Sequence, residues 1–366
     1  MPASGHTGTE IEIEIERLDT ATRPGSAGGP DFVATSALID DIYAELEGDR
    51  GMTRTPGQRR IAWRERDINE ISVWIARRRR EVVGYAFHRR PLHEGARESW
   101  LFLGVRADAR RRGIASALLD RVVEEARQAG STTLQSFVMS HLAAGDELLP
   151  VEGGTGGVPV DAPSTGLARA RGFRLVQALV GSAVDVPLPA SRLADLERSL
   201  PASSADYDVV TWEMPTHPDL ATDVAELKTR MVTAAPSGGT AAGADPWDPA
   251  RLLEAERALT SMGRRRLYAA ARHRGTGRLV AFTEIEPPLV EGAPASQEFT
   301  LVLREHRGHG LGLLVKIANA RRLAEACPGT TRLKTFNADE NAPMRRINDA
   351  LGFRPHVVSG GWRLDL

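Results

Sequence analysis

The two halves of the chain carry the same series of features in the same order. In each half, an apolar and β-prone run is followed by a turn rich in arginine and glycine, and then by a helical pattern that ends at a glycine. These segments are 99–105, 110–115 and 116–130 in the first half, and 297–303, 307–312 and 313–329 in the second. Each half then continues with a strand, a short helix and a Gly-Phe-Arg tripeptide, at Gly172 and at Gly352. Repetition of the whole series predicts two copies of one structural unit.

Earlier segments of the two halves also correspond. Opening strands are expected at 11–18 and 207–213, first helices at 31–47 and 218–232, and hairpins at 73–88 and 267–285. A chain of 366 residues exceeds what one core usually supports. We therefore expect an α/β fold of two tandem domains, each a mostly antiparallel, twisted mixed sheet with helices on its faces. The expected boundaries are 1–186 and 207–366, joined by a linker rich in Pro, Ala and Ser at 187–206.

Composition excludes several classes of protein. The formal net charge of −1 gives no reason to expect a nucleic-acid partner, and no apolar run is long enough for a membrane span. The single cysteine, Cys327, rules out an intrachain disulfide, and the polar N-terminus does not resemble a signal peptide. The nine histidines show no ligand spacing, so no metal is expected. We expect a cytoplasmic protein that is a monomer or homodimer. Only three of the 47 basic residues are lysines, which suggests a GC-rich bacterial source.

Both turns have the composition of an anion site. The first turn of a helix has unpaired N–H groups and the positive end of the helix dipole, and both favour a bound phosphate. Glycine lets the phosphate approach the backbone closely, and the arginines add positive charge. One such turn is equally well explained as a tight connection with solvated arginines, but two copies in the same context favour phosphate binding. Neither turn is a P-loop or a Rossmann fingerprint, because the residues that define those motifs are missing.

The turns and the segment 341–353 together resemble the GNAT N-acetyltransferase superfamily. The tandem arrangement is similar to mycothiol synthase and related actinobacterial double-GNAT proteins. The resemblance implies splayed central strands in each domain, with acetyl-CoA bound as co-substrate. Its pyrophosphate would lie on the turn and its pantetheine between the splayed strands. The implied acetyl-CoA-binding residues are Val105, Arg110, Arg111, Arg112, Gly113, Ile114 and Ala115 in the first half, and Val302, Leu303, Arg307, Gly308, His309, Gly310, Leu311, Gly312, Asn337 and Asn341 in the second.

The resemblance also implies a position for the general base. Many members of the superfamily place a carboxylate on the motif strand, four residues before the valine that precedes the turn. That position is Glu298 in the second half and Leu101 in the first. The other position that members use is six residues before the valine, where the first half has Ser99, a poor base. The alternative is that Glu298 is an ordinary charge at a strand edge.

The usual general acid of the superfamily is missing. Its tyrosine stands five residues before the phenylalanine of Gly-Phe, where this chain has Asn348 in the second half and Ala168 in the first. Asn348 can donate a hydrogen bond to sulfur but cannot supply a proton, so water or another tyrosine such as Tyr268 would have to serve.

We therefore expect the C-terminal half to be catalytic and the N-terminal half to be degenerate. The expected reaction is direct attack by a primary amine of a small molecule on acetyl-CoA, with the thioester carbonyl oriented by the main chain near Val302 and Leu303. Gly312 and Asn341 suggest tighter acetyl-CoA binding in the C-terminal half. The alternative is a non-catalytic acyl-CoA sensor or interaction protein, and the identity of the acceptor stays open.

Overall fold

The computed structural model describes residues 13–20, 29–63, 69–93, 95–234 and 246–366, and residues 11 and 12 of the expected first strand lie outside this part. The chain forms two compact units. Unit 1 comprises residues 1–45, 53–137 and 364–366, and unit 2 comprises 46–52 and 138–363. Among the described residues, no helix is both long enough and apolar enough to span a lipid bilayer.

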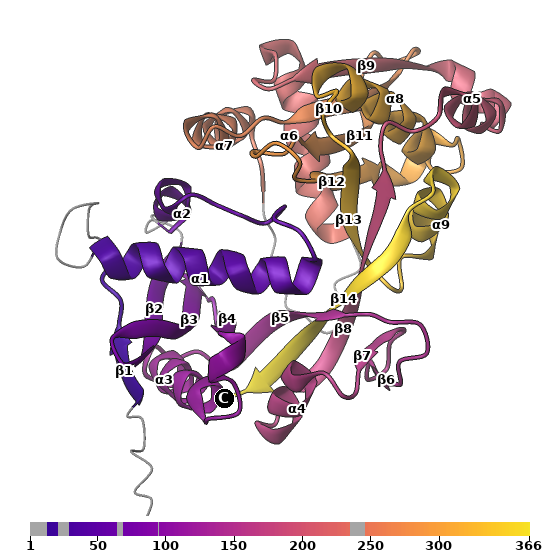
Figure 1. Cartoon of the computed structure of the whole chain (residues 1–366). Coiled ribbons are helices and arrows are strands. Elements are labelled where there is room, and N and C mark those ends of the chain that lie inside the picture. The colour runs from indigo at the N-terminus through magenta and orange to yellow at the C-terminus, as the bar shows by residue number, and fades with distance from the viewer. Residues whose placement is uncertain (1–12, 21–28, 64–68, 94, 235–245) are drawn as a thin grey trace, which may run out of the picture. The chain divides into compact units, whose positions relative to one another are not determined.

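Unit 1 contains a sheet with the strand order β1-β2-β3-β4-β5. Its strands are β1 (Ile13–Arg17), β2 (Asn69–Arg78), β3 (Glu81–Pro91), β4 (Glu98–Val105) and β5 (Thr133–His141), whose last residues belong to unit 2. Its helices are α1 (Gly29–Glu47), α2 (Pro56–Ala62) and α3 (Ile114–Gln128). Neighbouring strands are antiparallel except β4 and β5, which are parallel. A side chain at Gly84 would meet α3 and one at Gly104 would meet α1, so these helices cover opposite faces (Figure 1).

Unit 2 contains the strand order β14-β8-β13-β12-β11-β10-β9. These strands are β14 (Arg354–Asp365), β8 (Arg174–Asp185), β13 (Arg332–Ala338), β12 (Ala295–Val302), β11 (Leu279–Glu286), β10 (Leu267–His273) and β9 (Tyr207–Glu213). The helices are α4 (Pro163–Ala170), α5 (Ala190–Arg198), α6 (Pro218–Ala234), α7 (Pro249–Ser261), α8 (Leu311–Ala326) and α9 (Ala342–Leu351). A small hairpin is formed by β6 (Leu148–Pro150) and β7 (Gly157–Pro159). Only β12 and β13 pair in parallel in the large sheet.

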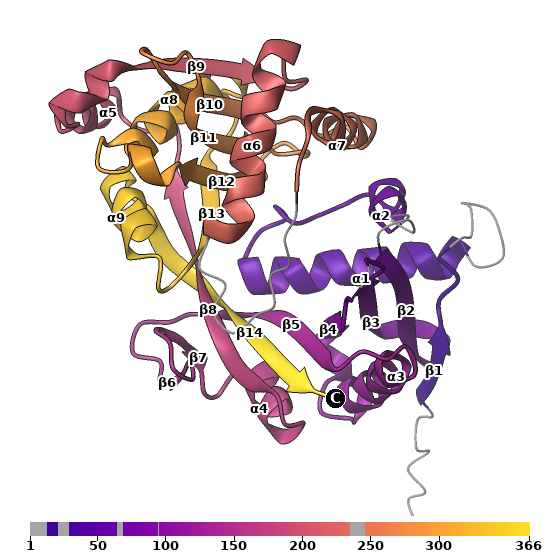
Figure 2. The ribbon, with the colours of Figure 1, turned by 180° about the vertical axis from the view of Figure 1, so that it is seen from behind.

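Alternate residues of β10 point to opposite faces of this sheet, as the period of two in a strand requires. Tyr268 and Ala270 pack in the core beneath α6 and α7, whereas Ala269 and Ala271 pack beneath α8. Figure 2 shows α6 and α8 on the two sides of the strands. The mixed sheet with helices on both faces confirms the predicted fold class.

Strand β8 comes from the first half of the sequence but lies in the sheet of unit 2. It pairs antiparallel with β13 on one side and with β14 on the other, and Figure 1 shows β8 and β14 side by side. The boundary between the compact units in this part of the chain is 137/138, whereas the repeat predicts a linker at 187–206. Strand pairing between distant segments overrides the order of the repeats, and the sequence pattern does not encode it.

The expected linker is packed. It forms α5 and a short 3-10 turn, η2 (Ala202–Asp206). Leu188 and Leu193 are buried in one core cluster with Leu267 of β10 and Ile285 of β11. These apolar side chains give the segment a hydrophobic face, which explains why it docks on the sheet.

The repeated Gly-Phe pair ends a helix in each half. Gly172 and Gly352 have φ of 77° and 96°, the left-handed conformation that glycine adopts at helix ends. The N–H of Phe173 donates to the carbonyl of Ala168 at 2.9 Å, and the N–H of Phe353 donates to that of Asn348 at 3.0 Å. The spacing of five residues between these positions is thus fixed by a helix-ending hydrogen bond in both halves.

Candidate functional site

The two turns have the same backbone geometry. After β4 and β12, short 3-10 turns, η1 (Ala107–Ala109) and η3 (Arg304–His306), lead to Gly113 and Gly310, which precede α3 and α8. These two glycines have φ of 78° and 73°. Two residues earlier, Arg111 and Gly308 also have positive φ, 62° and 88°. A non-glycine residue rarely adopts this conformation, so the same constrained turn is kept in both halves.

Corresponding arginines brace the turns in the same way. The Nε of Arg110 donates to the carbonyl of Val105 at 2.9 Å, and the Nε of Arg307 donates to that of Val302 at 3.3 Å. Arg110 also forms a two-pronged ion pair with Glu45 at 2.7 and 2.6 Å, which raises the pKa of Arg110. Arg307 is exposed. Among the described residues, the buried Nδ1 atom of His309 has no hydrogen-bond partner. Both turns lead directly into a helix, whose first amides have no carbonyl of a preceding turn to bond and suit an anion.

The surroundings of the turn glycines differ. A Cβ at Gly113 would meet no atom within 4 Å, whereas one at Gly310 would lie 2.7 Å from Pro201. A Cβ at Gly312 would lie 2.9 Å from the Ile347 side chain of α9. Gly312 therefore permits close packing of α8 and α9, and this role differs from the phosphate approach expected of it. The sequence argument for tighter acetyl-CoA binding in the second half loses this support.

The central strands diverge in both halves, as predicted. Strands β4 and β5 pair only from Glu98 to Trp100, and β12 and β13 pair only at Ala295 and Ser296. Beyond these pairs, toward the turns, each couple of strands has separated. We call the gap between the two diverging strands the wedge. It leaves unpaired backbone groups on both sides, which suit an extended chain that carries amides, such as pantetheine.

A β-bulge interrupts β12 at Glu298. In the ladder with β11, Thr283 pairs with Thr300 and Ile285 pairs with Gln297, so that Glu298 and Phe299 together lie opposite Glu284. The ladder of β3 and β4 in the first half runs from Gly84–Val105 to Arg89–Trp100 without a shift. Bulges leave an unpaired residue and redirect side chains, and they are enriched next to active sites. The main chain near Val302 and Leu303 was expected to orient a thioester; within it, the amide of Leu303 donates to the carbonyl of Val280 at 2.9 Å.

Charged and aromatic groups surround the bulge. Glu298 is partly buried, and Phe299 is 47% exposed with its ring centroid 5.5 Å from the Lys228 ammonium. Fully buried Glu284 pairs with Lys228 and, at 2.7 Å, with Arg266. Burial opposes the charge of Arg266, but the carboxylates of Glu284 and Glu298 raise its pKa above the ordinary value. Glu298 thus lies within the field of this largely buried cation, just beyond Ser296, where β12 and β13 begin to separate.

Asn348 takes part in a buried polar chain. Lys316 of α8 donates to the Oδ1 of Asn348 at 2.7 Å, and the Nδ2 of Asn348 donates to the Oδ1 of Asn337 on β13 at 2.6 Å. Lys316 is 2% exposed, and burial lowers its pKa to about 7. Sequence reasoning did not identify Lys316. The available signal was a lysine on the apolar face of a helix in a chain that otherwise uses arginine.

Two expected site residues have structural partners. The side chain of Asn341 caps α9 by accepting from the N–H of Met344 at 3.3 Å, the usual role of asparagine at that position. Tyr268 packs under α6 and α7, on the face of the sheet opposite α8, and its hydroxyl donates to Glu256 at 2.9 Å. The structure therefore does not bring Tyr268 to Asn348.

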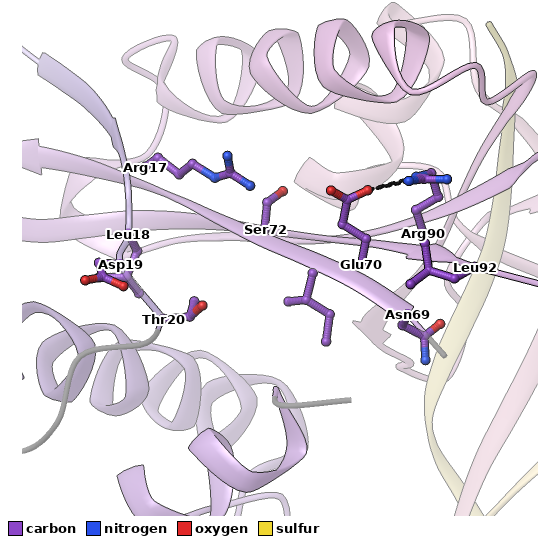
Figure 3. Close-up of a pocket in the computed structure, with 10 residues that line it drawn as sticks. Arg17, Leu18, Asp19, Thr20, Asn69, Glu70, Ser72, Arg90 and Leu92 are labelled. Carbon is purple, nitrogen blue, oxygen red and sulfur yellow. Dashed lines mark hydrogen bonds and ion pairs between the residues drawn. The ribbon is translucent and has the colours of Figure 1, made fainter. Parts of the chain in front are cut away.

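The first half lacks ionisable groups at the corresponding positions. Leu101 and Ser99 are buried, and the Ser99 hydroxyl bonds to Ser131 at 2.6 Å. A hollow of about 630 Å³ does occur in unit 1, and the Glu70–Arg90 ion pair lines it (Figure 3). It lies toward the Asn69–Pro91 end of the β2–β3 hairpin, several residues from the Gly84–Val105 pair beside the turn. In the described ranges, no group of three or more His, Cys, Asp or Glu residues is placed to hold a metal.

Comparisons with known proteins agree with this geometry. The profile of the acetyltransferase (GNAT) family matches residues 38–145, which include the turn of the first half. A tandem GNAT protein from the clavulanic acid biosynthesis pathway is 28% identical, with a TM-score of 0.72 and coverage of 97% of this chain and 98% of that one. A GCN5-related N-acetyltransferase from Sphaerobacter thermophilus shares the fold at 14% identity, with a TM-score of 0.59 and coverage of 96% and 95%. No curated protein sequence matches the chain. The family profile over the first half and the full-length tandem relative, together with the paired turns and wedges, show two GNAT-like domains in tandem, and GNAT enzymes transfer acyl groups from acyl-CoA.

Proposed function

We propose that the C-terminal half transfers an acetyl group from acetyl-CoA to a primary amine of a small molecule by direct attack. The observation that carries the proposal is the bulge at Glu298, which lies where the β12–β13 wedge begins, because the first half has neither the bulge nor a carboxylate there. The tandem relative lends support to the choice of acyl group, because its solved structure is specified as the form without acetyl-CoA.

Each part of the site has a role in this reaction. The turn amides, with Arg307 and His309, would hold the pyrophosphate, and the wedge would hold the pantetheine. Bound acetyl-CoA supplies a thioester carbonyl, and the backbone that the bulge releases from the ladder can donate a hydrogen bond to its oxygen. As the amine nitrogen attacks the carbonyl carbon, its proton passes to Glu298, directly or through water. The C–N bond forms, the C–S bond breaks, and the sulfur leaves with the electron pair.

We propose a different role for the N-terminal half. Its turn keeps the anion-binding geometry and is open around Gly113, but Leu101 cannot accept a proton. This half would therefore bind acyl-CoA without acyl transfer.

The second candidate function is a non-catalytic acyl-CoA sensor, which the missing tyrosine at Asn348 favours. A thiol-release assay with acetyl-CoA and a panel of amines separates the two. The enzyme should release CoA with at least one amine, whereas a sensor would bind acetyl-CoA and release no thiol with any of them.

The role of Glu298 is tested by Glu298→Gln, which keeps the shape and removes proton acceptance. The rate should fall by roughly 10²–10⁴, the usual contribution of a general base. The loss should shrink as the pH rises from about 6 to 9.5, because more of the amine arrives without its proton. Acetyl-CoA affinity should stay within about twofold of the wild-type value, because the carboxylate faces the amine.

Glu291→Gln is the matched control, because Glu291 is an exposed carboxylate in a loop of the same half. It should leave the rate unchanged. Turnover of Glu298→Gln equal to that of the control at every pH would contradict the assignment. A joint collapse of thermal stability and acetyl-CoA affinity would show that Glu298 supports the strand and not the reaction.

A further inference from the structure

Lys316 is the only one of the three lysines that is buried without a carboxylate. Lys228 pairs with Glu284, and Lys334 pairs with Glu47 and Asp49. In the part of the chain that the structure describes, Lys316 forms no ion pair; its ammonium donates to Asn348 at 2.7 Å and lies 5.8 Å from the centre of the Phe353 ring. An unpaired buried ammonium is costly, so its presence calls for an explanation. Lysine can lose its proton when buried, unlike arginine, which this chain uses at nearly all other basic positions.

The hydrogen bonds from Lys316 can run in only one direction. Lysine has donors and no acceptor, so Asn348 must turn its Oδ1 toward Lys316 and its Nδ2 toward Asn337. Asn337 must then present its own Oδ1 to Asn348, which leaves its Nδ2 without an acceptor among the described residues. We call the three residues the Lys316 relay. It begins at a buried cation and ends at an open N–H donor on β13, the strand that borders the wedge.

The first half has apolar residues at all three positions of the relay. Lys316 lies nine residues after Arg307, and Leu119 lies nine after Arg110. Asn337 lies four residues beyond the Leu333–Ala295 pair, and Val138 lies four beyond the Leu134–Ser99 pair, which corresponds to it once the extra residue of the bulge is counted. Asn348 corresponds to Ala168. The relay is therefore present as a whole in the half that has Glu298 and absent as a whole from the half that lacks it.

We propose that the Lys316 relay stabilises the departing thiolate of the acyl-CoA, with Asn337 as the group that touches sulfur and Lys316 as the positioning residue that polarises it. This inference rests on the proposed function of the C-terminal half. As the C–S bond breaks, negative charge develops on sulfur, and the Nδ2–H of Asn337 donates to it. The Lys316 ammonium polarises the side-chain amides of Asn348 and Asn337 in turn, and this makes the Nδ2–H of Asn337 a stronger hydrogen-bond donor. The thiolate takes its proton from water on release, so the reaction needs no tyrosine.

The test compares Lys316→Met with the wild type over pH 6 to 9.5, with an accepted amine. Methionine keeps the length of the side chain and removes the charge. At pH 6 we expect kcat to fall about 10- to 100-fold, the worth of a hydrogen bond to a charged group, with acetyl-CoA affinity within about twofold. The ratio of the two rates should approach one as the pH rises above 7, because Lys316 itself loses its proton. Burial is the cause of its lowered pKa, and no carboxylate, imidazole or guanidinium contributes to that shift. Glu298 is present in both proteins, so its contribution cancels in the ratio.

A second measurement asks whether the relay acts as a unit. Asn348→Ala places the residue of the first half at that position and breaks the relay in the middle. Its effect on kcat should match that of Lys316→Met, and the double variant should lose no more than either single variant. Lys316→Leu, which copies Leu119, serves in place of Lys316→Met if methionine lowers the thermal midpoint.

The outcomes separate this inference from the function on which it rests. A rate ratio that is independent of pH, or losses that multiply in the double variant, would assign Lys316 a structural role only. If Glu298→Gln is impaired and Lys316→Met is not, the relay is refuted and the proposed function stands. If the wild type releases no thiol with any amine, both are refuted.

Discussion

Tyr268 shows how the surroundings of a residue decide its role. It is the tyrosine that the sequence offered as a substitute acid, but it is 1% exposed and its hydroxyl is bonded to Glu256. Burial, with the nearby carboxylates of Glu284 and Glu256, raises its pKa well above the ordinary value. A buried phenol with a raised pKa keeps its proton, so Tyr268 stabilises the core beneath α6 and α7 and does not act as an acid.

We therefore expect Tyr268→Phe to leave kcat within about twofold of the wild type. The free energy of unfolding should fall by about 1.5–3 kcal/mol, because a buried hydrogen bond to a charged group is lost. Steady-state kinetics and thermal unfolding measure the two effects. A large loss of kcat at unchanged stability would return Tyr268 to the reaction.

At the scale of elements, one carboxylate of helix α3, Glu125, links the helix to its sheet by hydrogen bonds in addition to the buried apolar contacts. Glu125 accepts hydrogen bonds from Ser72 and Trp74 of β2 and contacts His88 of β3 at 3.2 Å. Burial by itself would raise the pKa of Glu125, but the bonds from His88, Ser72 and Trp74 outweigh it and lower the pKa from 4.5 to about 2. The ionised form is thus the one that the folded protein stabilises.

The lowered pKa of Glu125 makes the stability of the folded protein depend on pH. Because the folded-state pKa of Glu125 is depressed, its contribution to stability is fully present above about pH 4.5 and is lost as the pH falls toward 2. Glu125→Gln should lower the free energy of unfolding by about 1–3 kcal/mol at pH 7, and the difference from wild type should vanish near pH 2. Chemical denaturation at several pH values measures this. The neighbouring exposed Glu124→Gln is the control, and an equal effect of the two variants would contradict the role of Glu125.

Most individual elements could be predicted from the sequence. The hairpins, the motif strands, the turns and the helices after them follow from apolar periodicity and from glycine positions, which are local signals. Helix α7 and the β6–β7 hairpin were not predicted, because both lie beside glycine-rich stretches that resemble loops. The bulge at Glu298 was also missed, since an extra residue in one strand becomes visible only against its partner strand.

At the scale of the whole molecule, β8 makes the C-terminal half dependent on the first. Without β8, both β13 and β14 would lose a paired edge. Val184 would also leave the core cluster that contains Leu333 and Phe353. Unpaired apolar edges promote aggregation.

We expect the fragment 207–366 to aggregate or to unfold without cooperativity, and the fragment 174–366, which includes β8, to show a cooperative thermal transition. Both fragments lack Glu47 and Asp49, so the loss of their ion pairs with Lys334 affects the two equally. Circular dichroism and gel filtration compare them. A stable, cooperative 207–366 fragment would show that β8 is dispensable.

The sequence by itself determined the duplication, the two turns rich in arginine and glycine, and the position of Glu298, because each depends on residues that are close together in the chain. Only the tertiary structure decided that β8 belongs to the sheet of unit 2, that Gly312 serves the packing of α9, and that Lys316, Asn348 and Asn337 form one relay. Those three residues come from two helices and a strand, and their hydrogen bonds exist only once the elements have packed. Burial, which gives Lys316 its chemistry, is likewise a property of the packed core and not of the local sequence.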